Sequence, residues 1–315
     1  MMRMSLKENK RENTMIERKL LLGDEAIALG AVHAGISGVY AYPGTPSTEI
    51  TEYIPRHAPE VRSRWCTNEK TAMEAALGMS FAGKRALVCM KHVGLNVAAD
   101  AFVNSGMTGV NGGVVVVSAD DPSMHSSQNE QDSRFYGKFA MIPILEPASQ
   151  QEAYDMMSYA FDMSEELKLP VLMRLVTRMA HSRAVVEIGQ VRDENELNPP
   201  ASDVMDWVLL PAIARRKNDA LTALQPKLVA NAEQSKYNIQ IRKGNAKNGV
   251  IACGIGYNYV NENLSDLEEY DILRIAQYPA PIKLIQEMAQ RCDSILVVEE
   301  GQSFVEEQLK GILSQ

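Results

Sequence analysis

The stretch RALVCMKHVGLNVAADAFVNSGMTGVNGGVVVVSADDP, residues 85–122, decides the fold class. Two short apolar runs, RALVCM and VVVVSA, enclose the helical pattern NVAADAFVNSG. A strand, a helix and a second strand at this spacing predict two parallel strands joined by a crossover helix. The uninterrupted valines indicate a strand that is buried on both faces, as in a parallel sheet covered by helices.

The same alternation of strand and helix extends in both directions from this stretch. A strand GVYAY and a helix over residues 69–81 precede it, and the strands AMIPILEP and PVLMRLV follow it, separated by a long helix. Ser149 and Glu152 form a capping-box pattern at the start of that long helix. We therefore predict an α/β fold whose main domain, residues 18–180, is built on a parallel sheet.

The remaining segments differ in pattern from this domain. Residues 1–17 are polar and basic, and we expect a tail rather than a signal peptide or a membrane span. Residues 181–246 contain a proline pair and a charged helical pattern, which predict a connector without alternating strands. In residues 247–315 three strands each lead into a helix, which predicts a second, smaller α/β domain.

The composition limits the classes of function. With 45% hydrophobic and 23% charged residues, the chain has the make-up of an ordinary globular protein. The formal net charge is −8 and no lysine or arginine cluster follows the first twenty residues, which argues against nucleic acid or an anionic membrane as partner. The four cysteines are too scattered for a zinc or iron-sulfur motif. We expect a cytoplasmic protein that binds no metal through its cysteines.

Ligands of open parallel sheets bind beyond the carboxyl ends of the strands, so the loops at these ends are the candidate sites. The first such loop is YPGTPSTEI, residues 42–50, where Thr45 is placed as the N-cap of a helix and Pro46 as its first residue. The free N–H groups at such a helix start suit a carboxylate or a phosphate. A capped helix without a ligand explains this segment equally well.

The second loop, KHVGLN, gathers Lys91, His92 and Asn96 around Gly94, a residue that allows close approach of the backbone. A lysine beside a histidine suits a substrate that carries a carboxylate, although a solvated lysine and a buried, hydrogen-bonded histidine are the simpler alternative. The third loop is long and polar and starts at Asp120. A lid or an interface loop is one interpretation of this segment; the simpler one, which we favour, is that its aspartates only cap the loop backbone.

Glu69 stands at the start of a helix that is almost apolar on all sides and that Asn68 can cap. The helix dipole favours a carboxylate at this position, and that electrostatic role alone accounts for the residue. If the helix start is buried, however, the carboxylate needs a hydrogen-bond partner or a function.

Several motifs together resemble one known family. The segments LLGDEAIALGAVHAG, YPGTPSTEI, TNEKTAMEAALG, GKRALVCMKHVGLNVAADAF and SADDPSMHSSQNEQDSR are similar to the alpha subunits of indolepyruvate:ferredoxin oxidoreductase, a thiamine-diphosphate-dependent 2-oxoacid oxidoreductase. The resemblance runs from residue 19 to 181 and resumes in GVIACGIGYNYV and ILVVEEGQSFVEEQL. It implies a pyrimidine-binding domain over residues 18–180 and a transketolase-C-terminal-like domain over residues 247–315.

The resemblance also implies roles for the residues of these loops. Glu69 would be catalytic: it would hydrogen-bond a pyrimidine ring nitrogen of the cofactor and favour the imino tautomer, whose nitrogen removes the thiazolium proton. The substrate-binding residues would be Thr45, which would hold the carboxylate of a 2-oxo acid, with Lys91 and His92. The further cofactor-binding residues would be Tyr42, Pro43, Gly94 and Asn96.

The sequence departs from this family in two motifs. It contains neither the GDG-type magnesium motif of the diphosphate-binding domain nor the cysteine clusters that hold iron-sulfur centres. The resemblance therefore covers the N-terminal half of the family's chain, and we expect magnesium and 4Fe-4S clusters only on a partner chain. This chain would be inactive without that partner.

Three hypotheses follow. The first is a split enzyme that, with its partner chain and a beta-type subunit, oxidatively decarboxylates indolepyruvate or another aryl 2-oxo acid to its acyl-CoA, with ferredoxin as acceptor. The second is a noncatalytic binding or regulatory remnant of that enzyme. The third is a subunit of a nonoxidative 2-oxoacid decarboxylase. A homo- or hetero-oligomer is expected, and the preferred 2-oxo acid and the stoichiometry stay open.

Overall fold

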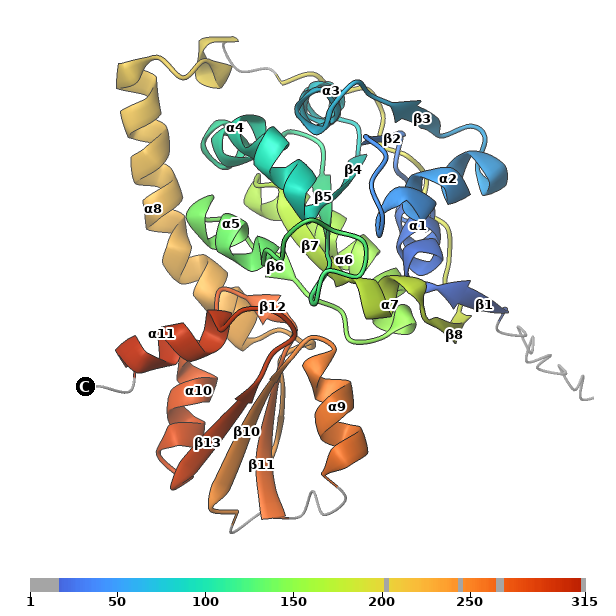
Figure 1. The fold of residues 1–315 in the computed structure, drawn as a ribbon. Helices are drawn as coiled ribbons and strands as arrows, with labels where there is room; N and C mark the ends of the chain where they lie inside the picture. Colours follow the sequence, from blue (N-terminus) through green and yellow to red (C-terminus); the bar gives the residue numbers. More distant parts are fainter. Residues whose placement is uncertain (1–16, 201–203, 243–245, 265–268, 313–315) are drawn as a thin grey trace, which may run out of the picture.

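The structure is a computed structural model that describes residues 17–200, 204–242, 246–264 and 269–312. The predicted tail lies almost entirely outside these residues. Figure 1 shows two α/β units, one above the other, with the long helix α8 (Pro211–Glu233) running along one side from the first unit to the second. No helix in the described ranges is long and apolar enough to cross a membrane.

The first unit is built on a seven-stranded sheet in the order β12-β6-β7-β5-β4-β2-β3. Its strands are β2 (Gly38–Ala41), β3 (Arg62–Trp65), β4 (Ala86–Lys91), β5 (Val114–Asp120), β6 (Ile144–Leu145), β7 (Val171–Val176) and β12 (Gln277–Tyr278). Neighbouring strands pair in parallel, except that β12 is antiparallel to β6. The predicted parallel sheet is confirmed.

Helices cover both faces of this sheet. The apolar cluster on one face includes α1 (Gly23–His33), α2 (Thr48–His57) and α6 (Gln150–Leu167); that on the other includes α3 (Glu69–Phe81) and α4 (His92–Thr108). Along β4, Leu87 and Cys89 join the first cluster, whereas Val88 and Met90 join the second. Because successive side chains enter opposite clusters, each central strand is apolar at every position.

The second unit is a four-stranded sheet in the order β13-β10-β11-β9. The three strands β10 (Asn248–Cys253), β11 (Tyr270–Ile275) and β13 (Ser294–Val298) are parallel and alternate along the chain with α9 (Gly256–Asn263), α10 (Ile282–Ala289) and α11 (Phe304–Ile312). The three predicted pairs of strand and helix are thus confirmed. The apolar cluster beside α3 and α4 continues into this unit through Tyr278 and Phe304.

One expectation about strands was wrong, and one strand of the first sheet was not predicted. The connector contains β8 (Arg183–Glu187), which pairs with β1 (Arg18–Leu22), and β9 (Ile239–Ile241), which extends the second sheet. The edge strand β3 was not predicted either, because three of its four residues are exposed and its sequence RSRW has no apolar run. Edge strands lack the burial on both faces that makes central strands recognisable.

Candidate active site

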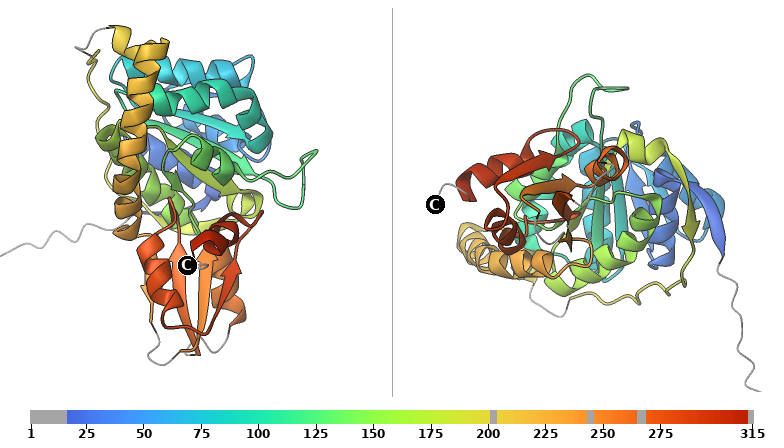
Figure 2. Two further views of the ribbon diagram at one scale, coloured as in Figure 1. Left: turned by 90° about the vertical axis from the view of Figure 1, so that its left-hand side faces the viewer. Right: turned by 90° about the horizontal axis from the view of Figure 1, so that it is seen from below.

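The parallel sheet brings the predicted loops together at one edge. Since β3, β2, β4 and β5 are consecutive neighbours, the segments that follow their carboxyl ends lie along the same side of the sheet (Figure 1). The long loop 121–132, drawn in green, projects from the body of the molecule in Figure 2. The edge thus collects loop 42–47, the start of α3, the start of α4 and loop 121–132.

Glu69 lies at the centre of this arrangement. Asn68 caps α3 as predicted, because its side-chain oxygen accepts a hydrogen bond from the Thr71 N–H at 2.9 Å. The Glu69 side chain is 8% exposed and rests on the backbone of Gly94, where an added Cβ would lie 2.5 Å from Oε1. Within the described ranges, no group donates a hydrogen bond to this carboxylate. A buried carboxyl group without a partner, at the ligand edge of a sheet, is available to a ligand.

The predicted N-cap of α2 was wrong. The helix begins at Thr48 and Ser47 precedes it, while the peptide bond between Thr45 and Pro46 is cis. The loop is held by its own hydroxyl groups: Ser47 donates to the Gly44 carbonyl at 2.8 Å, and Thr48 accepts from the Gly44 N–H at 2.9 Å. Thr45 is therefore not used for capping, and it is exposed at the edge of the sheet.

Lys91 lies against the same loop. An added Cβ at Gly44 would come within 3.0 Å of the Lys91 Cδ, so the aliphatic stem of the lysine packs on the loop backbone. Tyr42 and Pro43 are both exposed on this loop. The structure thus brings Lys91 to the segment that carries Thr45. Two residues that bind one substrate must lie close together, so this proximity is compatible with their predicted role.

His92 and Asn96 make contacts that the sequence did not predict. His92 is 1% exposed, and its Nε2 lies 3.1 Å from the carbonyl oxygen of Asn129 in loop 121–132. Asn96 is exposed on α4 and accepts a hydrogen bond from the Tyr136 hydroxyl on α5 (Ser133–Phe139). In this conformation His92 supports the long loop, so its predicted contact with substrate stays a prediction.

Asp121 organises the start of the long loop, as expected of a capping aspartate. Its carboxylate accepts hydrogen bonds from the Ser126 N–H and the Thr177 hydroxyl, each at 2.8 Å. Burial alone would raise its pKa, but these hydrogen bonds outweigh burial and lower the pKa of Asp121 to about 2.

A buried network of charges joins the two units, and the sequence analysis missed it. Arg174 on β7 contacts Asp120 at 2.6 Å, pairs with Glu146 and donates to the Glu300 carbonyl at 2.7 Å. The three residues Arg174, Asp120 and Glu146 are each at most 2% exposed. A charge inside the apolar strand VLMRLV was the available signal, because such a charge needs a buried partner.

A second arginine completes this network. Arg134 at the start of α5 binds the Asp132 carboxylate and reaches Glu299 at 2.8 Å. Burial alone would raise the pKa of Asp132, but the positive charges of Arg174 and Arg134 lower it. Glu299 also accepts hydrogen bonds from the N–H groups of Val305 and Glu306. It is therefore both a helix cap and a contact between the units.

The fold and this edge define an α/β protein whose candidate ligand site lies at the carboxyl ends of a parallel sheet. The chain belongs to the family described as pyruvate flavodoxin/ferredoxin oxidoreductase, thiamine diphosphate-binding, whose model matches residues 29–242. This match bears out the resemblance found in the sequence.

Curated relatives agree with the family. The chain is 42% identical over 304 residues to the indolepyruvate oxidoreductase subunit IorA of Archaeoglobus fulgidus, which covers 92% of this chain and 48% of the relative. It is 43% identical to the subunit IorA of Thermococcus kodakarensis, over 93% of this chain and 47% of the relative. The chain therefore spans about half the length of the curated relatives it matches.

Solved structures confirm the fold class. The 2-oxoglutarate:ferredoxin oxidoreductase from Magnetococcus marinus, with 2-oxoglutarate, coenzyme A and succinyl-CoA bound, aligns with a TM-score of 0.78 at 16% identity, over 94% of this chain and 60% of that chain. A split-gene transketolase in an inactive beta4 tetramer aligns with a TM-score of 0.60 at 15% identity, over 93% of this chain and 85% of that chain. At these identities the likeness is one of fold.

Proposed function

We propose that this chain is a subunit of a 2-oxoacid:ferredoxin oxidoreductase and supplies the pyrimidine-binding half of a thiamine diphosphate site. In this proposal residues 18–180 form the pyrimidine-binding domain and residues 247–315 form the transketolase-C-terminal-like domain, joined by the connector 181–246. The observation that carries the proposal is the Glu69 carboxylate, buried against Gly94 at the edge of the sheet without a hydrogen-bond partner in the described ranges.

The residues at this edge fit the cofactor. Glu69 would hold the pyrimidine ring through its carboxyl group, and Gly94 leaves the space in which that carboxyl group lies. Tyr42, Pro43 and Asn96 are exposed nearby and would line the same site. When bound, thiamine diphosphate supplies the nucleophile for attack on the keto carbon of a 2-oxo acid. Glu69 contributes by orienting the ring and by holding a proton at its carboxyl oxygen.

The proposed substrate is indolepyruvate or another aryl 2-oxo acid, which the assembly oxidises to its acyl-CoA with ferredoxin as electron acceptor. The Thr45 hydroxyl and the Lys91 ammonium group suit the carboxylate of such a substrate, because a charged donor and a hydroxyl make strong hydrogen bonds to it. Lys91 is positioned for this role by its packing on Gly44. His92 would act on the substrate through loop 121–132 or after leaving its contact with Asn129.

The diphosphate-binding domain, magnesium and 4Fe-4S clusters are proposed to belong to a partner chain, with a beta-type subunit completing the assembly. Large apolar side chains that remain exposed at this edge support a docking partner: Tyr42 is 42%, Trp65 45% and Val97 49% exposed. We expect the chain to be inactive until that partner covers the edge. Its location in the cytoplasm stays a prediction from the sequence.

Substitution of Glu69 by glutamine tests this function in the reconstituted complex. We expect ferredoxin reduction driven by indolepyruvate and coenzyme A to fall by about 100-fold to 10,000-fold, because the amide cannot hold the proton. The matched control is Glu74→Gln, since Glu74 is exposed on the same helix and faces only Lys70 at 4.0 Å. Near-normal turnover of the Glu69 variant would remove this residue from the mechanism.

A further inference from the structure

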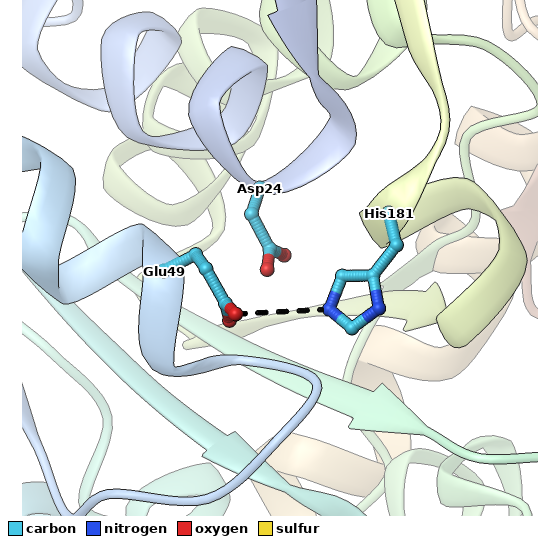
Figure 3. A group of neighbouring side chains, drawn as sticks. All are labelled: Asp24, Glu49 and His181. Atoms are coloured by element: carbon cyan, nitrogen blue, oxygen red, sulfur yellow. Dashed lines mark ion pairs between the residues drawn. The ribbon is translucent and has the colours of Figure 1, made fainter. Parts of the chain in front are cut away.

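Three side chains that play no part in the proposed site converge beside it. Asp24 lies in the first turn of α1, Glu49 in the first turn of α2 and His181 at the end of α7 (Thr177–His181). Figure 3 shows the three side chains pointing toward a common space. One ligand atom from each lies within 4.8 Å of the others, and the His181 Nε2 is 3.9 Å from the Glu49 Oε1.

Asp24 is the unusual member of this group. Its side chain is 0% exposed, and neither carboxylate oxygen has a hydrogen-bond partner in the described part of the chain. The Glu49 Oε2 is likewise buried and unpaired. Burial, followed by the negative charge of Glu49, raises the pKa of Asp24 well above its usual range. A buried carboxylate beside a second carboxylate is costly unless a cation or a proton compensates it.

We propose that Asp24, Glu49 and His181 bind a divalent transition-metal ion, with zinc the best match. Two carboxylates and one imidazole form the mixed oxygen and nitrogen set that such ions prefer, and three protein ligands leave a fourth position for water. Ligands at about 2.0–2.2 Å from a tetrahedral ion lie about 3.3–3.6 Å apart. The three ligand atoms lie within 4.8 Å of one another, so binding requires the side chains to close by up to about 1.3 Å.

The site is open to an ion from solvent. The side chains of Glu49 and His181 are each 39% exposed, whereas Asp24 closes the inner side. An ion here would link α1, α2 and α7. Helix α2 directly follows loop 42–47, and α7 starts at Thr177, whose hydroxyl donates to Asp121 of the long loop. The ion would therefore stabilise two loops of the edge, whether or not the proposed reaction is correct.

Calorimetric titration of the full chain with zinc, after removal of any tag and of bound metal by a chelator, tests this site. We expect one equivalent to bind, and thermal unfolding to shift upward by several degrees, because the ion binds only the folded chain. Asp24→Asn, Glu49→Gln and His181→Ala should each weaken binding by at least about 100-fold. The controls are Glu52→Gln on the exposed side of α2 and His125→Ala on the exposed loop, which should bind as the wild type does.

A second measurement keeps the test independent of folding defects. Asp24→Asn should unfold at a higher temperature than the metal-free wild type, because the amide avoids the cost of burying or protonating the Asp24 carboxylate, and zinc should then add nothing. Equal zinc affinity in all three variants would overturn the proposal and direct attention to the partly exposed thiols of Cys66 and Cys292. Absence of zinc binding to the wild type would overturn it in favour of a proton shared by Asp24 and Glu49.

Discussion

Replacement of Gly94 by alanine tests the contact on which the proposed function depends. The new Cβ would lie 2.5 Å from the Oε1 and 2.7 Å from the Cγ of Glu69, whereas ordinary contact begins at 3.4 Å. The carboxylate must therefore move by about 0.9 Å, or α4 must shift away from α3. A displacement of about 1 Å of a catalytic group costs on the order of 100-fold in rate.

The assay is steady-state turnover of 2-oxo acid by the reconstituted complex, together with the free energy of unfolding of this chain. Alanine in a helix is favoured over glycine by about 1 kcal/mol, so the substitution should not destabilise α4 through its backbone. Gly78→Ala is the matched control, because a Cβ at Gly78 in α3 would meet no atom within 4 Å. That variant should keep full activity and gain stability.

For Gly94→Ala we expect a loss of turnover on the order of 100-fold in a chain whose free energy of unfolding is close to that of the wild type. Turnover within a factor of two of the wild type, in a complex that still assembles, would show that the Glu69 position is not critical. If the variant does not fold, the lost activity could come from disturbed packing between α3 and α4 instead of a displaced Glu69. The Glu69→Gln variant, which adds no atom at position 94, would then decide between these two explanations.

Three further predictions concern other parts of the structure. Thr45→Val should raise the apparent KM for the 2-oxo acid about tenfold with kcat little changed, because one hydrogen bond to a carboxylate is lost; an unchanged KM would remove Thr45 from substrate binding. Arg174→Met should lower the free energy of unfolding by about 3 to 5 kcal/mol, measured by denaturation in urea, because it leaves Asp120 buried without its cation and Glu146 with Arg134 alone; a loss no larger than that for an exposed arginine such as Arg18 would contradict the role of the network. The lowered pKa of Asp121 means that its contribution to stability is present above its ordinary pKa of 3.8 and is lost as the pH falls toward about 2. The difference in unfolding midpoint between the wild type and Asp121→Asn should therefore shrink over this range, and a constant difference would refute the assignment.

The fold was predictable where burial on both faces leaves an unbroken apolar run. The strands β4, β5 and β7 are of this kind, and the helix over residues 69–81 was predicted with the bounds that the structure has. The strands β3, β8, β9 and β12 were missed because they are short or exposed, and their pairing depends on distant segments. Such pairing is a tertiary property that local sequence does not encode.

The candidate site was predictable in its location but less so in its contacts. The rule for parallel sheets predicted that the loops at the carboxyl ends of the strands lie together, and the structure adds the contacts of Lys91 with Gly44 and of Glu69 with Gly94. The sequence did not reveal that Ser47, rather than Thr45, precedes α2, because two hydroxyl residues stand within three positions there. Nor did it reveal the group of Asp24, Glu49 and His181, whose members are more than a hundred residues apart at the extremes.

The charge network and the order of the strands show where the second unit joins the sheet relative to Glu69. The second unit adds β12 beside β6 and is fixed through Arg134 and Arg174, at the end of the sheet opposite β2 and β3 (Figure 1). Glu69 follows β3, at the far end from that contact. The second unit thus joins the sheet at the end opposite β3, and we propose that a partner chain supplies the surface that covers the Glu69 carboxylate. Assays of cofactor binding should accordingly use the assembled complex, because the proposed cofactor site combines Glu69 of this chain with a domain of the partner chain.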